Sequence, residues 1–295
     1  MFGRILMTLG LAMLLAAPAH AGFGLVLPDS PIVDDPEKTS LNLVICAIDP
    51  ATGAGIPIER PQVFTALRYS GDNMDRSEHL SVLDEVVAYG ARAWTTNISL
   101  PHPGVYQLVM QTKAGWVPEQ DKFVQYVTKV QIPAYGSAEG WDKPANISFE
   151  ISPLSRPFGL CSGMAFSGQA LFDGTPIPGA LIDVARLDPA IKPNVAQPED
   201  PNAPPQDDKA QPKAKKQDKQ PTPQPISAFG TTQQVKADGQ GVFTFVCPLP
   251  GWWAFSTSMA GDPLQDPEGK QKPLEIKTIL WVYMNDCPKT APSKK

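Results

Sequence analysis

Histidine and cysteine are the side chains best suited to hold a transition metal, and this sequence has few of them. It contains three histidines and four cysteines among 295 residues. No cysteines form the C-x-x-C pair of zinc ribbons and thioredoxin-like redox sites. The H-E-x-x-H, G-x-S-x-G and phosphate-loop motifs are missing as well. We therefore expect a protein that is not an enzyme.

His79 is the histidine with the most acidic surroundings. It ends the polar stretch Asp72-Asn-Met-Asp-Arg-Ser-Glu-His79, which suits either a carboxylate–histidine cation site or an ordinary solvated loop. His102 lies between two prolines in a turn before a predicted strand, where we expect a structural or surface role.

Residues 1–21 have the pattern of a secretory signal peptide. Arg4 supplies the charged start, an uncharged apolar core follows, and Ala19-His20-Ala21 is an A-x-A cleavage site. We expect cleavage after Ala21, which discards His20. Cleavage after Ala19 would leave His20 at the N-terminus, where its amine and imidazole could chelate Ni²⁺ or Cu²⁺. No later segment reaches the ~20 apolar residues of a transmembrane helix, so we expect an exported chain that does not span a membrane.

The remaining chain is acidic and carries cysteines suited to an oxidising compartment. Of the 25 Lys and Arg, only Arg4 leaves with the leader, and 30 Asp and Glu oppose the rest. This balance argues against a nucleic-acid partner. Export permits disulfides, and four cysteines allow three pairings. We expect one or two structural disulfides, or buried thiols, at Cys46, Cys161, Cys247 and Cys287.

Short segments of alternating apolar and polar residues, bounded by Gly and Pro, predict an all-β fold of two β-sandwich domains. The first domain covers residues 22–153 and the second covers 154–287, with a tail at 288–295. The first domain's expected strands lie at 41–48, 62–69, 82–100 (two strands about Tyr89-Gly90), 104–112, 123–132 and 147–151.

Residues 189–225 form a different kind of segment inside the second domain. They contain ten prolines, mixed charges and no aromatic side chain. Such a segment cannot bury enough apolar surface to offset the entropy of ordering, so we expect a disordered insertion in which nothing packs.

The second domain resembles the carboxypeptidase-regulatory or transthyretin-like sandwich. The resemblance rests on Gly168–Leu187, with the turn pairs Asp173-Gly174 and Pro178-Gly179. It continues through 231–255, with Asp238-Gly239 and Pro250-Gly251. It implies a module that binds, braces or presents other molecules.

Taken whole, the sequence is similar to a family of bacterial periplasmic proteins with a domain of unassigned function, associated with nickel or cobalt uptake. The blocks that carry this resemblance are 23–28, Pro103-Gly104-Val105-Tyr106, Thr128-Lys129-Val130, Gly140-Trp141-Asp142, Pro153-Leu154-Ser155-Arg156-Pro157-Phe158-Gly159-Leu160, Val235-Lys236-Ala237-Asp238, Gly241-Val242-Phe243-Thr244 and Gly251-Trp252-Trp253.

The resemblance implies a periplasmic protein that holds or hands on nickel or cobalt for a metal transporter of the inner or outer membrane. Family members commonly carry a histidine before the Phe-Gly start, another before a proline in the first strand region, and a third before the Thr-Lys-Val strand. This chain has Gly22, Asp49, and Tyr126 or Gln125 there. We predict a metal site formed by the segment from Gly22 together with Asp49 and His79.

The loss of these imidazoles favours a second hypothesis, a non-catalytic structural or interaction protein of the cell envelope without a metal. In that case the sandwich edges and one ring of Trp252-Trp253 would dock onto a partner. Successive strand residues point to opposite faces, so one of the two rings is expected in the core, and in this second hypothesis the other forms an exposed interaction patch.

Overall fold

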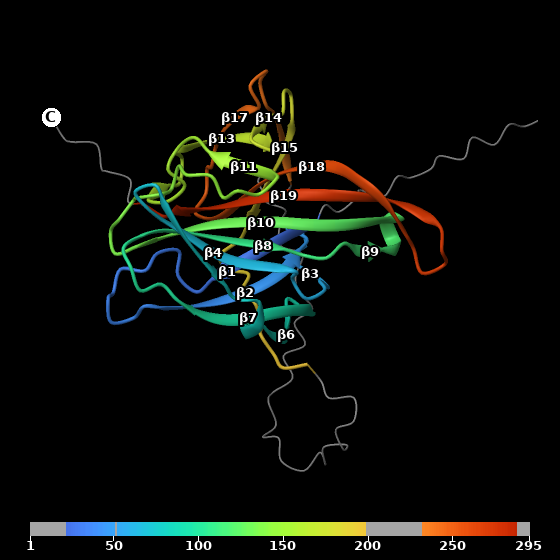
Figure 1. Cartoon of the computed structure of the whole chain (residues 1–295), viewed down its shortest axis with the longest axis horizontal. Coiled ribbons are helices and arrows are strands. Elements are labelled where there is room, and N and C mark those ends of the chain that lie inside the picture. The colour runs from blue at the N-terminus through green and yellow to red at the C-terminus, as the bar shows by residue number, and fades with distance from the viewer. Residues whose placement is uncertain (1–21, 51, 199–231, 288–295) are drawn as a thin grey trace, which may run out of the picture.

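The computed structural model describes residues 22–50, 52–198 and 232–287, and these form an all-β protein. Strands β1 to β19 make three stacked sheets (Figure 1). Two short 3₁₀ turns, η1 (Leu80–Val82) and η2 (Pro118–Gln120), lie between strands. The predicted fold class is confirmed. The signal peptide at 1–21 and the tail at 288–295 lie outside the described residues. No helix in the described part of the chain is long and apolar enough to cross a membrane.

Sheet A is the lower layer in Figure 1 and has the strand order β1-β2-β7-β6, with β3 paired to β2. The two strands expected about Tyr89-Gly90 are β6 and β7, joined by a tight turn in which Tyr89 and Gly90 both have positive φ. The bounds are β1 (Phe23–Pro28), β2 (Ser40–Ile48), β3 (Gly55–Ile56), β6 (Asp84–Ala88) and β7 (Ala91–Ser99).

Sheet B is the middle layer and belongs to both halves of the chain. Its order is β16-β15-β18-β19-β10-β8-β4-β5, with β12 on β19 and β9 on β10. The bounds are β4 (Val63–Ser70), β5 (Asn73–Glu78), β8 (Gly104–Gln111), β9 (Gly115–Val117), β10 (Lys122–Ala134), β12 (Leu160–Cys161), β15 (Leu181–Leu187), β16 (Gln233–Lys236), β18 (Gly251–Gln265) and β19 (Gln271–Asn285).

Sheet C is the upper layer, with order β11-β13-β14 and β17 paired to β13. The bounds are β11 (Phe149–Pro153), β13 (Ala165–Phe172), β14 (Thr175–Pro176) and β17 (Val242–Val246). The strand expected at 147–151, in the first domain, corresponds to β11. Its partner is β13 of the second half.

The two predicted sandwiches are joined by parallel pairing between β10 and β19. The register runs from Phe123 opposite Leu274 to Val130 opposite Trp281. One continuous sheet therefore serves both halves. Sheet A covers one of its faces, and sheet C covers the β15, β18 and β19 part of the other.

The core follows from strand alternation in β19. Ile279 and Trp281 pack toward sheet A, whereas Leu280, Val282 and Met284 pack toward sheet C. Because successive side chains point to opposite faces, a strand between two layers reads as a continuous apolar run. At roughly 25 cal/mol per Å² of apolar surface removed from water, such a strand contributes strongly to stability.

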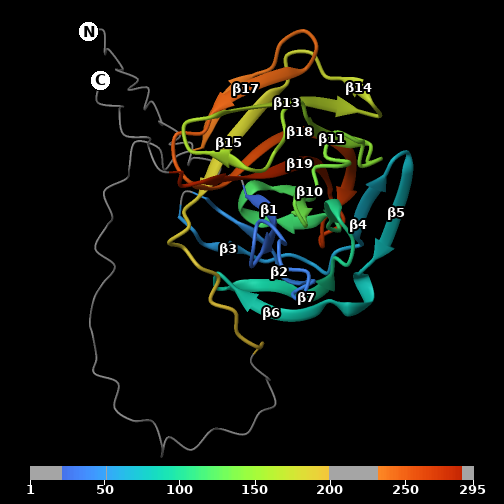
Figure 2. The same cartoon turned by 90° about the vertical axis from the view of Figure 1, so that its left-hand side faces the viewer.

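The segment that follows β15 contradicts part of the sequence prediction. Ala196 and Val87 exchange two backbone hydrogen bonds of 2.8 and 3.0 Å, which attach the segment to strand β6. Figure 2 shows this segment in yellow, running from β15 down beside sheet A. The expectation that nothing in 189–225 packs is therefore wrong for 189–198, because backbone pairing does not need a large apolar side chain. Residues 199–225 lie outside the described residues.

One disulfide joins Cys161 of β12 to Cys287 beyond β19, with Cα atoms 5.4 Å apart. Cys46 and Cys247 are buried thiols. Burial raises the pKa of each of these two thiols to about 12, so both stay protonated. We expected one or two structural disulfides, or buried thiols, and the structure has one disulfide and two buried thiols.

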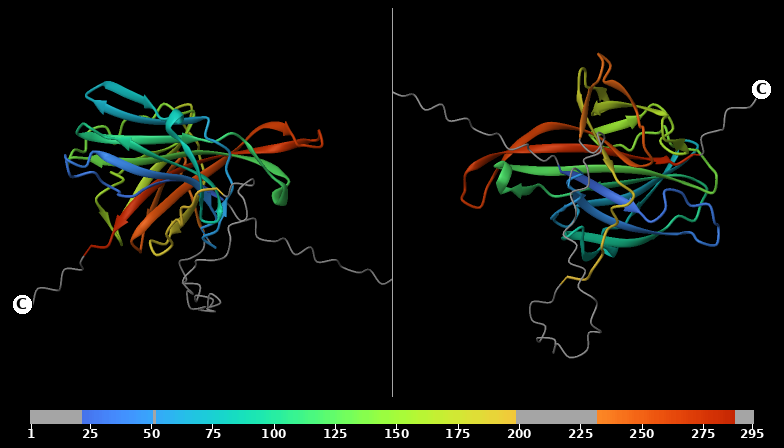
Figure 3. Two further views of the ribbon diagram at one scale, coloured as in Figure 1. Left: turned by 90° about the horizontal axis from the view of Figure 1, so that it is seen from below. Right: turned by 180° about the vertical axis from the view of Figure 1, so that it is seen from behind.

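The far ends of β18 and β19 form a hairpin that projects from one side of the body (Figure 3). Ion pairs attach it to the start of β10. Lys272 contacts Asp121 at 2.5 Å, and Lys122 contacts Glu275. These pairs hold the two halves of sheet B together where the hairpin leaves the body.

Candidate binding cleft

The structure brings two of the three predicted metal-site residues together. Phe23 pairs with Ile48, so the antiparallel register places Gly22 beside Asp49. A Cβ atom at Gly22 would lie 2.5 Å from the Tyr126 hydroxyl and from Ile56. Positions 22, 49 and 126, where the family resemblance implies histidines, therefore converge in space.

The side chains at these positions do not fit a nickel or cobalt site. Asp49 is 8% exposed, and its carboxylate accepts a hydrogen bond of 3.0 Å from Thr52. Burial, assisted by the charge of Glu275, raises the pKa of Tyr126, so its phenol stays protonated and is a poor ligand. Gly22 has no side chain. The set lacks the imidazole and thiolate donors that favour these metals.

His79 lies elsewhere, beyond strand β5 at the outer edge of sheet B. Strands β4 and β8 separate β5 from β10. The backbone N–H of His79 donates to Phe64, and its Nε2 lies 3.0 Å from the Ser77 hydroxyl. Burial lowers the pKa of His79, and Glu78 opposes this only partly. Within the described ranges, no group of three or more His, Cys, Asp and Glu side chains could hold a metal ion.

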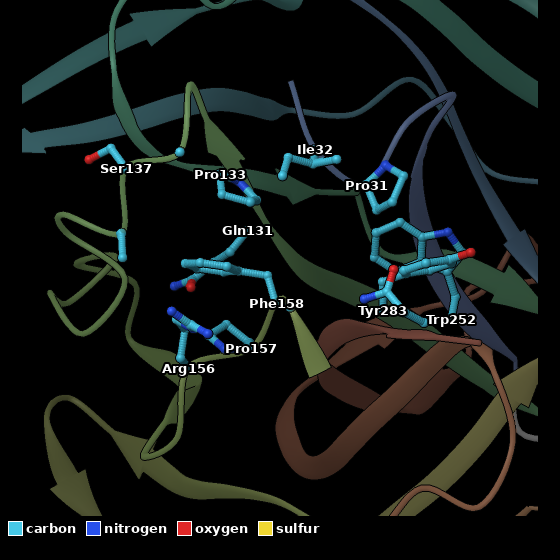
Figure 4. Close-up of a pocket in the computed structure, with 14 residues that line it drawn as sticks. Pro31, Ile32, Gln131, Pro133, Ser137, Arg156, Pro157, Phe158, Trp252 and Tyr283 are labelled. Carbon is cyan, nitrogen blue, oxygen red and sulfur yellow. The ribbon is translucent and has the colours of Figure 1, made fainter. Parts of the chain in front are cut away.

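A cleft of about 250 Å³ lies where the halves of the molecule meet (Figure 4). One wall is the loop after β1, another is the end of β10, and a third is the loop 154–159. The floor is formed by strands β18 and β19. Its main lining side chains are Pro31, Gln131, Arg156, Phe158, Trp252 and Tyr283.

Hydrogen bonds hold the loop 154–159 against sheets B and C. The N–H groups of Leu154 and Ser155 donate to Ser167 of β13 at 2.9 and 3.2 Å. Gly159 has φ of +67°, which glycine adopts at little cost, and it turns the chain into β12. The side chain of Asn285 on β19 then donates to Leu160 at 2.9 Å. These contacts fix the backbone on both sides of Arg156.

The opposite wall is attached to β10 by backbone hydrogen bonds. Val33 donates to Pro133, and Tyr135 donates to Val33 at 2.7 Å. The Ser30 hydroxyl also donates to Ile32. Both walls are therefore preformed, as is usual for ligand pockets.

Trp252 and Tyr283 form an aromatic platform on the floor of the cleft. The two residues face each other across β18 and β19, with ring centroids 5.1 Å apart and planes at 60°. The exposed ring that the interaction hypothesis places at this pair does not occur, because Trp252 is 8% and Trp253 2% exposed. A second hollow of about 410 Å³ shares Pro31 and this platform, and residues 187–193 line its far side.

The end of the cleft away from the platform is polar. Gln131 is 4% exposed, and its amide NH₂ donates to the Trp141 carbonyl at 2.9 Å. Because that carbonyl accepts, the other amide atom must be the oxygen. This oxygen has no hydrogen-bond partner among the described residues. A buried acceptor left unpaired costs about 1–3 kcal/mol.

Arg156 lies at the same end, and its guanidinium is 5.4 Å from the centre of the Phe158 ring. The Arg156 side chain is exposed, and no carboxylate of the described chain pairs with it. Figure 4 shows Gln131, Arg156 and Phe158 on one side of the cleft, and Pro31, Trp252 and Tyr283 on the other.

Sequence reasoning found part of this cleft and missed the rest. Arg156 and Phe158 belong to residues 153–160, one of the blocks that carry the family resemblance. Trp252 was predicted as a residue that could contact a partner. Gln131 gave no signal, because its burial depends on the loop that carries Trp141 closing over β10. Tyr283 gave none either, because its role follows from pairing with Trp252 across the sheet.

Solved structures that resemble the chain include the D0-D1 domain of intimin, at 8% identity and a TM-score of 0.21. That match covers 90% of this chain and 100% of the other. A marsupial T cell receptor matches at 10% identity and a TM-score of 0.21, covering 90% of this chain and 74% of that one. The search of curated proteins found no match. Residues 17–261 match the family described as "Domain of unknown function (DUF4198)". This match spans most of the 295 residues, so the chain belongs to the DUF4198 family.

Proposed function

We propose that this protein is an exported, periplasmic, non-catalytic binding protein whose ligand occupies the cleft beside Trp252 and Tyr283. The observation that carries the proposal is the cleft itself, with an aromatic platform at one end and unpaired polar groups at the other. Pockets that combine apolar walls with a few polar groups are the usual binding sites of proteins.

The position of the cleft supports the same function. Its walls come from both halves of the chain, and pockets form preferentially at such junctions. The hydrogen bonds that hold the walls are already made without a ligand, so little ordering is needed on binding.

The test is a thermal-shift screen of the protein beginning at Gly22, using small metabolites and short peptides. The matched variants are Ala138→Trp, which fills the cleft, and Ala114→Trp, which adds the same ring in the turn between β8 and β9. We expect ligands that stabilise the wild type and the Ala114→Trp variant but not the Ala138→Trp variant. Stabilisation of all three proteins alike would contradict the proposal.

A role in nickel or cobalt uptake, beside a membrane metal transporter, is the second candidate. The convergence of positions 22, 49 and 126 favours it, although the present side chains do not fit the metal. Calorimetric titration with Ni²⁺ and Co²⁺ tests it. Binding that is lost in Asp49→Ala and kept in His102→Ala would support a metal-carrying role. Absence of binding would remove the metal and leave the cleft proposal untouched.

A further inference from the structure

We propose that the cleft binds the C-terminal residue of an extended peptide. The peptide carboxylate lies on Arg156, its last backbone N–H donates to the Gln131 oxygen, and the chain before it runs over Trp252 and Tyr283. This inference rests on the proposed function and names the ligand of the same cleft.

The positive charge of Arg156 at the polar end of the cleft favours a ligand with an anionic group that has two oxygens. Arg156 presents a planar fork of N–H donors that matches a carboxylate in a bidentate arrangement. Its backbone is fixed by the Leu154 and Ser155 hydrogen bonds, and the Phe158 ring lies beneath the guanidinium. The exposed Arg156 side chain pairs with no carboxylate of the described chain, so its fork is open to solvent and to a ligand.

The neighbouring Gln131 oxygen favours a ligand that carries a hydrogen-bond donor next to its anionic group. A simple carboxylic acid offers only acceptors when ionised, and it would leave this buried oxygen unpaired. A peptide C-terminus has an amide N–H next to its carboxylate. One residue therefore supplies both groups that the polar end lacks.

The remaining walls suit an extended, apolar chain. Pro31 and the Trp252–Tyr283 platform lie between the two hollows, so a peptide that leaves the first hollow passes directly into the second. Grooves lined with aromatic side chains bind extended, proline-containing peptides, because the polyproline II conformation loses little entropy on binding. An N-acylated amino acid shares the polar chemistry and would fill the first hollow alone.

The experiment compares three probes by calorimetry: N-acetyl-prolyl-phenylalanine, its C-terminal amide, and N-acetyl-phenylalanine. We expect the free acid of the dipeptide to bind up to about fivefold more tightly than the amide, because the amide cannot form the ion pair with the exposed Arg156. Arg156→Ala should abolish this difference, and Arg156→Lys should keep only part of it. Arg76→Ala, on the exposed edge strand β5, is the matched control and should change nothing. Tighter binding of the dipeptide than of N-acetyl-phenylalanine supports the peptide, and equal binding overturns it in favour of a small acylated amino acid.

The Gln131 contact is tested from both sides. Gln131→Leu and methylation of the last peptide nitrogen should each weaken binding, and together they should cost no more than one alone. If Gln131→Leu does not fold, the methylated probe still decides the contact. Equal binding of acid and amide, or an unchanged Arg156→Ala variant, overturns this inference. If uncharged peptides then still bind and Ala138→Trp blocks them, the proposed function survives. If no probe in the wider screen binds, both fail.

Discussion

Lys129 and Glu150 form an ion pair in the interior of the protein. Lys129 lies on β10 and Glu150 on β11, with side chains 2% and 5% exposed, so the pair links sheets B and C. Burial lowers the pKa of Lys129, and the carboxylate of Glu150 opposes that shift. Each of these buried side chains therefore has the other as its ion-pair partner.

Removing one partner of this pair should be costly. Glu150→Gln leaves an uncompensated buried charge, and we expect a loss of about 3–5 kcal/mol in the free energy of unfolding. Replacing both residues by Met should cost less, because no charge remains. Urea denaturation measures both variants. Glu268→Gln, which breaks an exposed pair with Lys270, is the control and should have little effect. A small effect of Glu150→Gln would show that water reaches the site.

Glu275 should make stability depend on acid pH. Burial alone would raise its pKa, but hydrogen bonds from Lys122 and Ser258 outweigh burial and lower it below the usual 4.5. A lowered carboxyl pKa stabilises the fold above pH 4.5, and this contribution is lost as pH falls through the folded-state value. We expect Glu275→Gln to have a flatter stability curve than wild type below pH 4.5. Parallel curves from pH 6 down to 3 would contradict the assignment.

At the scale of elements, the strands follow from local pattern and their partners do not. Apolar runs of strand length, bounded by Pro and Gly, predicted the segments that became β2, β4, β8 and β10. The pairing of β10 with β19 joins residues about 150 positions apart, and no local pattern encodes such a partner. The cleft depends on this pairing. Sequence analysis could therefore point only to cleft residues in the blocks that carry the family resemblance, such as Arg156 and Trp252, and not to Gln131 or Tyr283.

The segment at 189–198 offers a test at the same scale. Ala196→Pro removes the N–H that donates to Val87, and we expect the segment to detach from β6. The cost should be about 0.5–1.5 kcal/mol, as for a typical hydrogen bond. Hydrogen exchange at the Val87 amide, which donates to Ala196, should become faster. Val195→Ala, an exposed neighbour, should leave that exchange rate unchanged.

For the molecule as a whole, the Cys161–Cys287 disulfide closes a loop with a sequence separation of 126. In the chain-entropy account, cross-links of this length stabilise by about 4–5 kcal/mol. The double variant Cys161→Ser/Cys287→Ser should lose an amount of that order in denaturant unfolding. A reductant should lower the melting temperature of the wild type and leave that of the double variant unchanged. An equal response of both proteins would assign the effect to another cause.

The position of β19 has a consequence for how the protein is made. It is the last of the described strands in chain order, yet it lies between β18 and β10 in the middle of sheet B. The strands of the first half therefore keep one central edge unpaired until residues 271–285 are available to pair. Long-range pairing of this kind is slow, and an unpaired edge invites aggregation. Any stop codon before residue 271 removes the strand that both halves share, so truncated chains should have neither sandwich rather than the first one alone.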